Sequence, residues 1–423
     1  MIKYLKCFSL LASVLLCYNC NEDKTKEEID IIQKIEKEQE NQTPPLFTYL
    51  KPSGTNISFS NDIVETDNFN IITYEYLYNG GGVAVGDINN DGLDDIYFTG
   101  NTVSNKLYLN QGNFSFKDIT QSAKVDGGKG FKTGVTMADV NNDGLLDIYV
   151  CKSVSTQDEL RKNLLYINNG DLTFTEKAEA YGLADTGYSV QAYFFDSDGD
   201  NDLDVYVLNH PKNLKEANVV KITQNENGKI SPAVPSDFTN LSNRFYENRV
   251  HTFFDSSEAA GILNDAFSLS AVIGDFNNDF KPDIYVCNDY IKPDRLLINK
   301  GNNRFEDKIE DYFSHTSFSS MGSDLADINN DGNPDLLTLD MAPNKNYRRK
   351  MMMMMQNYDK FQKMVNYNYG TQYASNILNI NNGNGSFSDI SFLNNVAQTE
   401  WSWSVLLSDI DNDGFKDIHV TNG

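Results

Sequence analysis

Short apolar runs separated by polar turns make up most of the chain after about residue 80. From Gly81 onward, the runs GGVAVG, DIYF and KLYLN follow one another, and Asp, Asn and Gly dominate the turns between them. Short runs rich in β-branched and aromatic residues, bounded by such turns, are typical of β-strands. The pattern therefore predicts an all-β fold.

The same order of polar and apolar positions returns six times along the chain. Each copy contains an acidic stretch with Asp at its first, fifth and ninth positions and Asn or Asp at its third. These stretches begin at Asp87, Asp139, Asp196, Asp275, Asp327 and Asp409. One apolar run precedes each stretch, another follows it, and runs such as NLLYIN and LTFTEK complete the unit. Four strands repeating at roughly 50 residues indicate a β-propeller with about six to seven four-stranded blades.

The propeller is expected to occupy residues 46–423, with insertions at about 211–242 and 341–374 where the repeats lie farther apart. The second insertion contains five consecutive Met residues and favours helix. It is expected either to cap the propeller or to form an adaptable binding surface. The segment 46–62 resembles a fourth strand that would complete the last blade. Because the chain stops after the second strand of the sixth unit, we expect an incomplete last blade and a longer natural protein.

The N-terminus has the pattern of an export signal. Lys3 and Lys6 precede a short apolar stretch that ends near Cys20, and a charged segment follows. We interpret residues 1–20 as a lipoprotein signal peptide with Cys20 as the lipidated residue, and residues 21–45 as a flexible linker. A cleaved secretory signal without lipid is the alternative. No later segment has the length and apolarity of a membrane span. The protein is expected at the outer membrane or cell surface, held by its lipid anchor.

The net charge of −25 changes the list of expected partners. It argues against nucleic acid, whose binding depends on Lys and Arg, and favours cations.

The chain has five cysteines. Cys151 and Cys287 occupy equivalent positions in two repeats and are expected to be buried free thiols rather than a disulfide.

Oxygen-bearing residues at positions 1, 3, 5 and 9 of each acidic stretch, with a carbonyl available at position 7, match the spacing of a calcium-binding turn. No Cys or His lies at these positions, which argues against zinc. An EF-hand would need Glu at position 12, where the first stretch has Phe98. Gly stands at position 6 in four stretches, the third has Asn201, which tolerates a left-handed backbone, and Phe280 makes the fourth the clearest departure. The alternative is a set of metal-free Asx turns.

Up to six Ca²⁺ ions are therefore expected. The expected ligands are Asp87, Asn89, Asp91, Leu93 and Asp95; Asp139, Asn141, Asp143, Leu145 and Asp147; Asp196, Asp198, Asp200, Asp202 and Asp204; Asp275, Asn277, Asp279, Lys281 and Asp283; Asp327, Asn329, Asp331, Asn333 and Asp335; and Asp409, Asp411, Asp413, Phe415 and Asp417.

These loops and their flanking strands resemble the FG-GAP/VCBS repeats of integrin α-subunit propellers over roughly residues 46–423. Stretches such as YNGGGVAVGDINNDGLDDIYFTGN are similar to the large FG-GAP/VCBS lipoproteins of Bacteroidetes, which often carry an ASPIC/UnbV segment. The resemblance implies a secreted, calcium-bound propeller. It implies no activity.

The sequence carries no catalytic signature. None of the four histidines lies in a metalloprotease pattern, and there is no P-loop or nucleophile elbow. Trp401 and Trp403 alternate along a strand, which favours blade core over a carbohydrate subsite. We expect a non-enzymatic module that binds a protein or a glycan. The alternatives are a carbohydrate-active enzyme, such as a polysaccharide lyase or hydrolase, and an RNA-associated role, which the charge and the export signal disfavour.

Overall fold

The computed structural model describes residues 46–211, 219–233, 242–352 and 357–423. The chain divides into two compact units, Met1–Leu50 and Lys51–Gly423. Residues 46–50 of the first unit are exposed and contain no helix or strand. The predicted signal peptide, the linker and Cys20 lie outside the described residues.

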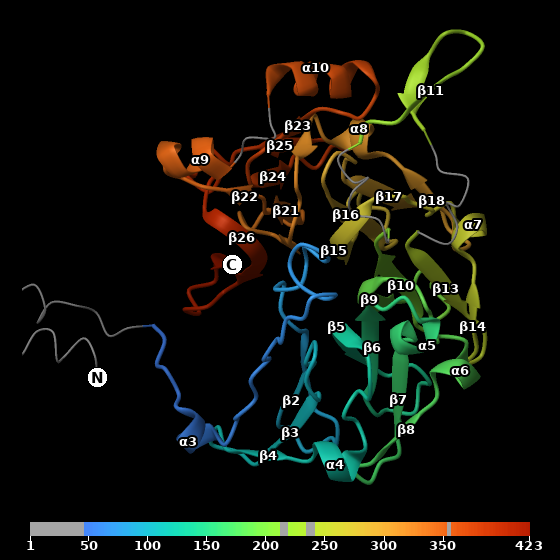
Figure 1. The fold of residues 1–423 in the computed structure, drawn as a ribbon, viewed down its shortest axis with the longest axis vertical. Helices are drawn as coiled ribbons and strands as arrows, with labels where there is room; N and C mark the ends of the chain where they lie inside the picture. The colour runs from blue at the N-terminus through green and yellow to red at the C-terminus, as the bar shows by residue number, and fades with distance from the viewer. Residues whose placement is uncertain (1–45, 212–218, 234–241, 353–356) are drawn as a thin grey trace, which may run out of the picture. The chain divides into compact units, whose positions relative to one another are not determined.

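The second unit consists mainly of six small antiparallel sheets, which confirms the predicted all-β propeller (Figure 1). We number them as blades 1 to 6 in chain order. Blade 1 contains β1 (Val83–Gly86), β2 (Asp95–Phe98), β3 (Lys106–Asn110) and β4 (Phe116–Asp118); blade 2 contains β5 (Phe131–Ala138), β6 (Asp147–Ser153), β7 (Leu164–Asn168) and β8 (Phe174–Glu176); blade 3 contains β9 (Ser189–Phe195), β10 (Asp204–Asn209), β13 (Arg244–Asn248) and β14 (Phe253–Asp255). Blade 4 contains β15 (Phe267–Gly274), β16 (Asp283–Asp289), β17 (Arg295–Asn299) and β18 (Phe305–Asp307); blade 5 contains β20 (Ser323–Ala326), β21 (Asp335–Thr338), β24 (Ile377–Asn381) and β25 (Phe387–Asp389); blade 6 contains β22 (Met341–Ala342), β26 (Glu400–Ser408) and β27 (Asp417–Asn422).

The first strand of each blade contacts the first strand of the next, from β1 through to β26. In blade 6, β26 and β27 are equivalent to the first and second strands of the other blades. Apolar side chains fill the space between consecutive blades. Tyr97 of blade 1 and Ile148 of blade 2, for example, belong to one buried cluster. In blades 2 to 5 the second strands are buried along their whole length, because each of these blades is covered by a blade on either side. Cys151 and Cys287 lie buried on two such strands as free thiols, as predicted.

The first and last blades each keep one face uncovered by the described residues. In β26 of blade 6, Val405 and Leu407 are buried, whereas Leu406 between them is 52% exposed. In β1 of blade 1, Val83 and Val85 are more than half exposed, and Ala84 between them is buried. Side chains alternate between the two faces of a strand. One face of blade 1 and the opposite face of blade 6 therefore remain open.

The prediction that 46–62 forms the closing strand of the last blade is wrong. Residues 52–55 form a single helical turn, α3 (Pro52–Thr55), and no strand lies in residues 51–62. Instead this segment contacts blade 1: the Ser58 backbone N–H donates to the Tyr108 hydroxyl at 3.2 Å, and Phe59 stacks on Phe98. The apolar alternation that suggested a strand is satisfied by packing against blade 1.

Residues 69–77 form an aromatic cluster with the first strands of blades 2 and 4. Tyr74, Tyr76 and Leu77 are buried against Phe131 and Phe267. The Tyr76 hydroxyl donates to Asp289 Oδ2 at 2.9 Å. A segment with no repeat character thus joins blades that are distant in sequence.

Both predicted insertions connect the second and third strands of their blades. The first contains the hairpin β11 (Ile222–Gln224) and β12 (Ile230–Pro232), with residues 212–218 and 234–241 outside the described residues. The second contains α9 (Asn346–Met352) and α10 (Tyr358–Asn366), which confirms the predicted helical character. Met353–Met355 of the Met run are not described. β19 (Thr316–Ser317) pairs in parallel with β23 (Gln372–Tyr373) beside this insertion.

One-turn helices follow the fourth strands of blades 1 to 4. They are α4 (Thr120–Ala123), α6 (Ala178–Tyr181), α7 (Ser257–Ala260) and α8 (Ile309–Tyr312), and α5 (Asp158–Arg161) lies between β6 and β7. Among the helices in the described part of the chain, none is long and apolar enough to cross a membrane.

Candidate functional site

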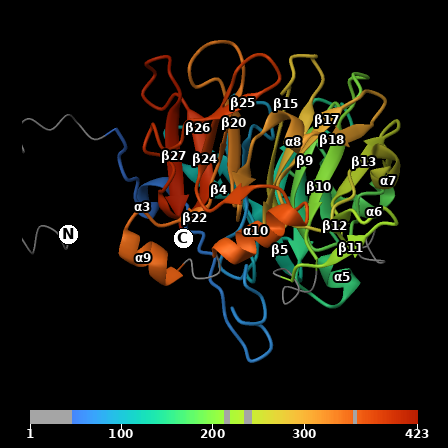
Figure 2. The same ribbon diagram turned by 90° about the horizontal axis from the view of Figure 1, so that it is seen from above.

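The six acidic loops lie together on one face of the propeller. Each loop connects the first strand of its blade to the second, whereas each insertion connects a second strand to a third. Because the strands are antiparallel, these two kinds of connection lie at opposite ends of the blades. Figure 2 shows α10 and the β11–β12 hairpin at one end and the first-to-second strand loops at the other. We call the two ends the loop face and the insertion face.

In two loops the structure brings three carboxylates together. The side-chain oxygens of Asp196, Asp198 and Asp200 lie within 4.8 Å of one another in blade 3. Asp409, Asp411 and Asp413 converge in the same way in blade 6. In the other four loops position 3 is Asn, so an amide oxygen takes the place of one carboxylate.

The aspartate at position 1 organises the backbone of its loop. Asp87 Oδ1 accepts the N–H of Asp91 at 3.1 Å, and its Oδ2 accepts the N–H of Gly92 at 2.7 Å. These bonds, with that of Gly92 the strongest, lower the pKa of Asp87. The turn thereby holds this carboxylate ionised and directed into the loop.

The aspartate at position 9 has a second role that the sequence did not reveal. It is buried at the start of the second strand in blades 1 to 5. Asp147 Oδ2 accepts the Val140 N–H at 3.2 Å, and its Oδ1 accepts the Asn168 N–H at 2.8 Å. Burial raises the pKa of Asp147 to about 7. A carboxylate oxygen has two lone pairs, so each can accept one further partner.

The same pair of bonds ties the loop to the third strand in four other blades. The third-strand N–H groups belong to Asn110, Asn248, Asn299 and Asn381, and the accepting carboxylates to Asp95, Asp204, Asp283 and Asp335. The repeated Asn of the third strand was visible in the sequence, but without a partner its role could not be assigned.

Two buried side-chain oxygens in the loops have no hydrogen-bond partner. They are Asn89 Oδ1, at position 3 of the first loop, and Asp202 Oδ1, at position 7 of the third. Burial, followed by the charges of Asp200 and Asp204, raises the pKa of Asp202 to about 6. An unsatisfied buried oxygen costs free energy unless a cation or donor reaches it. The atoms that these loops offer as metal ligands are all oxygens, so the residues fit a hard cation such as Ca²⁺.

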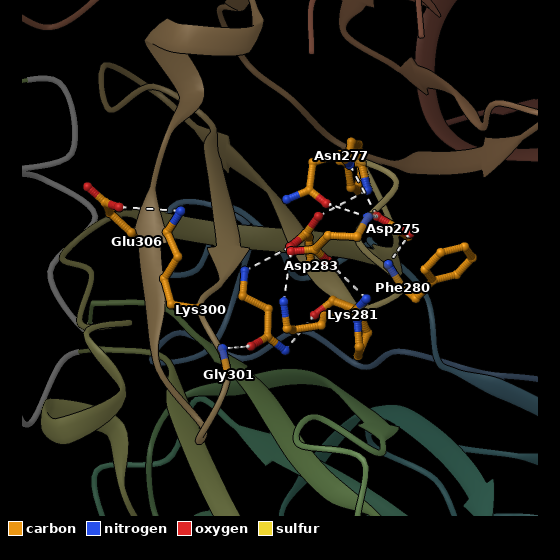
Figure 3. Close-up of polar contacts among 12 residues, drawn as sticks. Asp275, Asn277, Phe280, Lys281, Asp283, Lys300, Gly301 and Glu306 are labelled. Atoms are coloured by element: carbon orange, nitrogen blue, oxygen red, sulfur yellow. Dashed lines mark hydrogen bonds and ion pairs between the residues drawn. The ribbon is translucent and has the colours of Figure 1, made fainter. Parts of the chain in front are cut away.

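The fourth loop keeps the common backbone despite Phe280 at position 6 (Figure 3). Phe280 adopts φ 63°, a left-handed conformation that glycine usually supplies. Its N–H donates to Asp275 Oδ2 at 2.7 Å, as Gly92 does to Asp87. Lys281 Nζ lies 3.0 Å from Asp279 Oδ2. This internal cation lowers the affinity that we expect of the fourth loop for Ca²⁺.

Neighbouring loops are joined through the asparagine at position 4, which the sequence analysis did not single out. Asn90 Nδ2 donates to the Gly144 carbonyl at 3.0 Å, and Asn330 Nδ2 donates to the Gly414 carbonyl at 3.0 Å. Asn142 donates to the Asn201 carbonyl in the same way. These asparagines have positive φ, which turns the amide toward the next blade. Position 4 of the third loop is Gly199, which has no side chain to continue the series.

On the insertion face, the two insertions contact each other. Tyr369 Oη donates to the Lys221 carbonyl at 2.7 Å, and Asn368 Nδ2 donates to the Ile230 carbonyl at 2.6 Å. Met364 of α10 is buried with Tyr369 and Ile291. For α10, the predicted cap is therefore confirmed.

The tryptophans predicted as blade core are only half-buried. Trp403 lines a cavity of about 220 Å³ with Gly82, Thr133, Val190 and Leu269, among others. These residues come from the first strands of several blades or from the segments just before them.

Comparisons with known proteins agree with the repeat. A family model described as an FG-GAP-like repeat matches residues 87–150, 154–207 and 275–338. Cartilage acidic protein 1 of Xenopus tropicalis is 42% identical over 72 residues, which is 17% of this chain and 11% of that protein. Its Mus musculus counterpart is 42% identical over 69 residues, 16% of this chain and 11% of that protein. The matched stretch is therefore a small part of these relatives.

A solved lectin of Agrocybe aegerita that recognises non-reducing terminal N-acetylglucosamine has 17% identity and a TM-score of 0.42, covering 79% of this chain and 72% of the lectin. The six sheets, their order and the matched repeats together define the architecture. The chain is an all-β, six-bladed propeller that contains FG-GAP-like repeats at residues 87–150, 154–207 and 275–338.

Proposed function

We propose that this protein is a calcium-stabilised propeller that acts as a binding module for a protein or glycan at the cell surface. One observation carries the binding role: two insertions from different blades are bonded to each other on one face, through Tyr369 and Lys221. Neither insertion is needed to complete a blade. Loops that gather on one face of a rigid scaffold are where binding residues concentrate.

The loop face supports the calcium part of the proposal. The residues at positions 1, 3 and 5 of each loop, the carbonyl at position 7 and the aspartate at position 9 would hold the ion. Bound Ca²⁺ would supply positive charge between carboxylates that otherwise repel one another. The unsatisfied oxygens of Asn89 and Asp202 support this assignment.

Surface attachment is proposed from the sequence of the N-terminus alone. Cys20 would carry the lipid, and export would place the propeller outside the inner membrane. Metabolic labelling with a fatty-acid analogue tests this: the full chain should incorporate label, and Cys20→Ser should not. Labelling that persists in Cys20→Ser would refute Cys20 as the anchor.

Screening the full chain in Ca²⁺ against a glycan array, with calorimetry of each hit, tests the binding role. The proposal predicts at least one saturable ligand that the protein returns unchanged. Release of shortened or unsaturated products from a polysaccharide would instead establish an enzyme. Failure to bind any glycan on the array, together with failure to capture a protein from intact cells, would contradict a binding module.

A further inference from the structure

One cavity of the insertion face lies between α9 and blade 5. It has a volume of about 600 Å³ and is lined by residues that include His315, Arg349, Lys350, Tyr373 and Phe392. Arg349 and Lys350 come from α9, and Tyr373 from β23. His315 immediately precedes β19, and Phe392 follows β25. The cavity therefore joins an insertion to the edge of a blade; we call it the α9 groove.

The α9 groove carries available positive charge in a strongly acidic protein. Arg349 and Lys350 form no ion pair among residues 46–211, 219–233, 242–352 and 357–423, whereas the adjacent Arg348 pairs with Glu400 at 3.0 Å. Lysine and arginine side chains that line a groove without acidic partners are suited to bind a carboxylate or sulfate, and arginine can do so with two parallel bonds.

The acidic residue in the groove is already engaged. Asp389 Oδ2 lies 3.1 Å from His315 Nε2, and its Oδ1 accepts the Ser391 N–H at 2.8 Å. Although burial opposes the charged form, the bonds from His315 and Ser391 lower the pKa of Asp389. His315 Nδ1 lies 2.9 Å from Ser314 Oγ. Asp389 is thus already bonded to His315 and Ser391, whereas Arg349 and Lys350 remain available to a ligand.

Two aromatic rings border the groove and remain accessible. Tyr373 is 48% exposed and Phe392 is 68% exposed. The Tyr373 ring is held in place, since it stacks on Phe361 of α10 with centroids 5.6 Å apart and meets the edge of His315 at 5.1 Å. A fixed aromatic ring beside polar groups can pack against the apolar face of a sugar ring. Gln398 adds an amide that can bond hydroxyl groups.

We propose that the α9 groove binds an acidic oligosaccharide, with Arg349 and Lys350 pairing with its carboxylate or sulfate and Tyr373 and Phe392 packing against its rings. This inference rests on the proposed function and names the ligand class and the site. A saccharide fits better than an acidic peptide because the groove combines exposed rings and an amide with its cations. The overall negative charge favours a ligand with spaced acidic groups over a dense polyanion.

Calorimetry of the full chain in Ca²⁺ tests the proposal, with oligogalacturonate as the acidic probe and a cello-oligosaccharide of equal length as the neutral one. The acidic probe should bind at least about tenfold more tightly than the neutral one. The double variant Arg349→Gln/Lys350→Gln should lose about tenfold or more of that affinity, and Phe392→Ala should also weaken it about tenfold. Both changes are at residues that pack in no core, so the fold should persist.

Lys124→Gln/Lys129→Gln is the matched control, because it removes the same charge from exposed positions between blades 1 and 2. It should bind oligogalacturonate as the unaltered chain does. Equal affinity for the neutral probe, or equal loss in the control, would overturn the proposal. The proposal would also be overturned if neither oligogalacturonate nor a sulfated oligosaccharide bound. Binding of a phosphorylated peptide instead of these saccharides would overturn it too. If the array yields another ligand that Arg349→Gln/Lys350→Gln still binds, the binding module stands and this site is refuted.

Discussion

Asp283 Oδ1 accepts the backbone N–H of Asn299 at 2.7 Å, and this bond fastens an acidic loop to the third strand of its blade. The other oxygen of Asp283 accepts the Phe276 N–H at 3.0 Å. The carboxylate is fully buried, so these bonds form where water cannot compete. The loop residues expected to hold a cation thus also hold the blade together.

The first prediction concerns this bond in blade 1. Asp95→Ala should lower the free energy of unfolding by about 2–4 kcal/mol, because it leaves the N–H groups of Ile88 and Asn110 buried without an acceptor. Urea unfolding in excess EDTA measures this without a contribution from metal. Asp94→Ala, one residue earlier and exposed, should change stability by less than about 0.5 kcal/mol. Equal effects of the two substitutions would contradict the structural role of Asp95.

The bonds between loops can be tested with a substitution that keeps the left-handed backbone. Asn330→Gly should destabilise the protein by about 0.5–1.5 kcal/mol, because it removes the bond from Nδ2 to the Gly414 carbonyl. Asn412→Gly is the control, since Asn412 has a similar φ and, among the residues described, its side chain bonds no other loop. Unfolding free energies that change equally in both variants would show that the contact between loops contributes nothing.

Phe280 offers a test of backbone strain. Phe280→Gly should stabilise the protein by about 0.5–1 kcal/mol, because the left-handed conformation costs a non-glycine residue and the ring is 95% exposed. Phe415→Gly should not stabilise it, since Phe415 is exposed in another loop but does not have positive φ. Thermal unfolding of both variants provides the comparison. A lower melting temperature for Phe280→Gly would indicate that the ring makes a stabilising contact.

Blade 4 has a buried carboxylate, Asp294, where blade 2 has the amide of Asn163. Asn163 Nδ2 donates to the Tyr149 hydroxyl and to Ser189 Oγ; at the equivalent position, Asp294 Oδ2 accepts from the Tyr285 hydroxyl and Ser320 Oγ. Burial raises the pKa of Asp294 to about 7. Asp294 therefore contributes its full stabilisation below about pH 4, the pKa of an aspartate in the unfolded chain. This stabilisation is lost as the pH rises through about 7, the pKa in the folded protein.

Asp294→Asn should remove this pH dependence. Between pH 4 and pH 8 the unaltered chain should lose on the order of 2–4 kcal/mol of stability relative to the variant. Urea unfolding of both proteins across this range measures the difference. In the reverse variant, Asn163→Asp, the same dependence should appear in blade 2. A difference between Asp294→Asn and the unaltered chain that stays constant with pH would refute the assignment.

The spacing of residues predicted the blades and the acidic loops because both depend on local patterns. Alternation and Asn-Gly turns specify short strands, and the period of the repeat specifies the blade. The course of residues 51–77 could not be predicted, because Phe59 and Tyr76 find their partners on blades 1 and 4, far away in sequence. The bonds of Asn90 and Asn168 were hidden for the same reason: each asparagine was visible, but its acceptor or donor lies in another strand or blade.

The α9 groove shows the same limit at the candidate site. Arg349 and Lys350 directly precede the Met run of the second insertion, and His315 is one histidine among four. The fold brings them beside Tyr373 and Phe392, which are conspicuous in no motif. A ligand site that is assembled from an insertion and a blade edge leaves no continuous signature in the sequence.

The melting temperature of the full chain with and without Ca²⁺ tests the central claim most directly. Scanning calorimetry should show a lower melting temperature in EDTA and its recovery on adding Ca²⁺, because an ion that binds only the folded state stabilises it by about 2.7 kcal/mol per site at 100 times Kd. Mg²⁺ at the same concentration should restore less, because the loops offer more oxygens and more flexibility than its strict octahedron uses. A melting temperature that is the same in EDTA and in saturating Ca²⁺ would contradict the account.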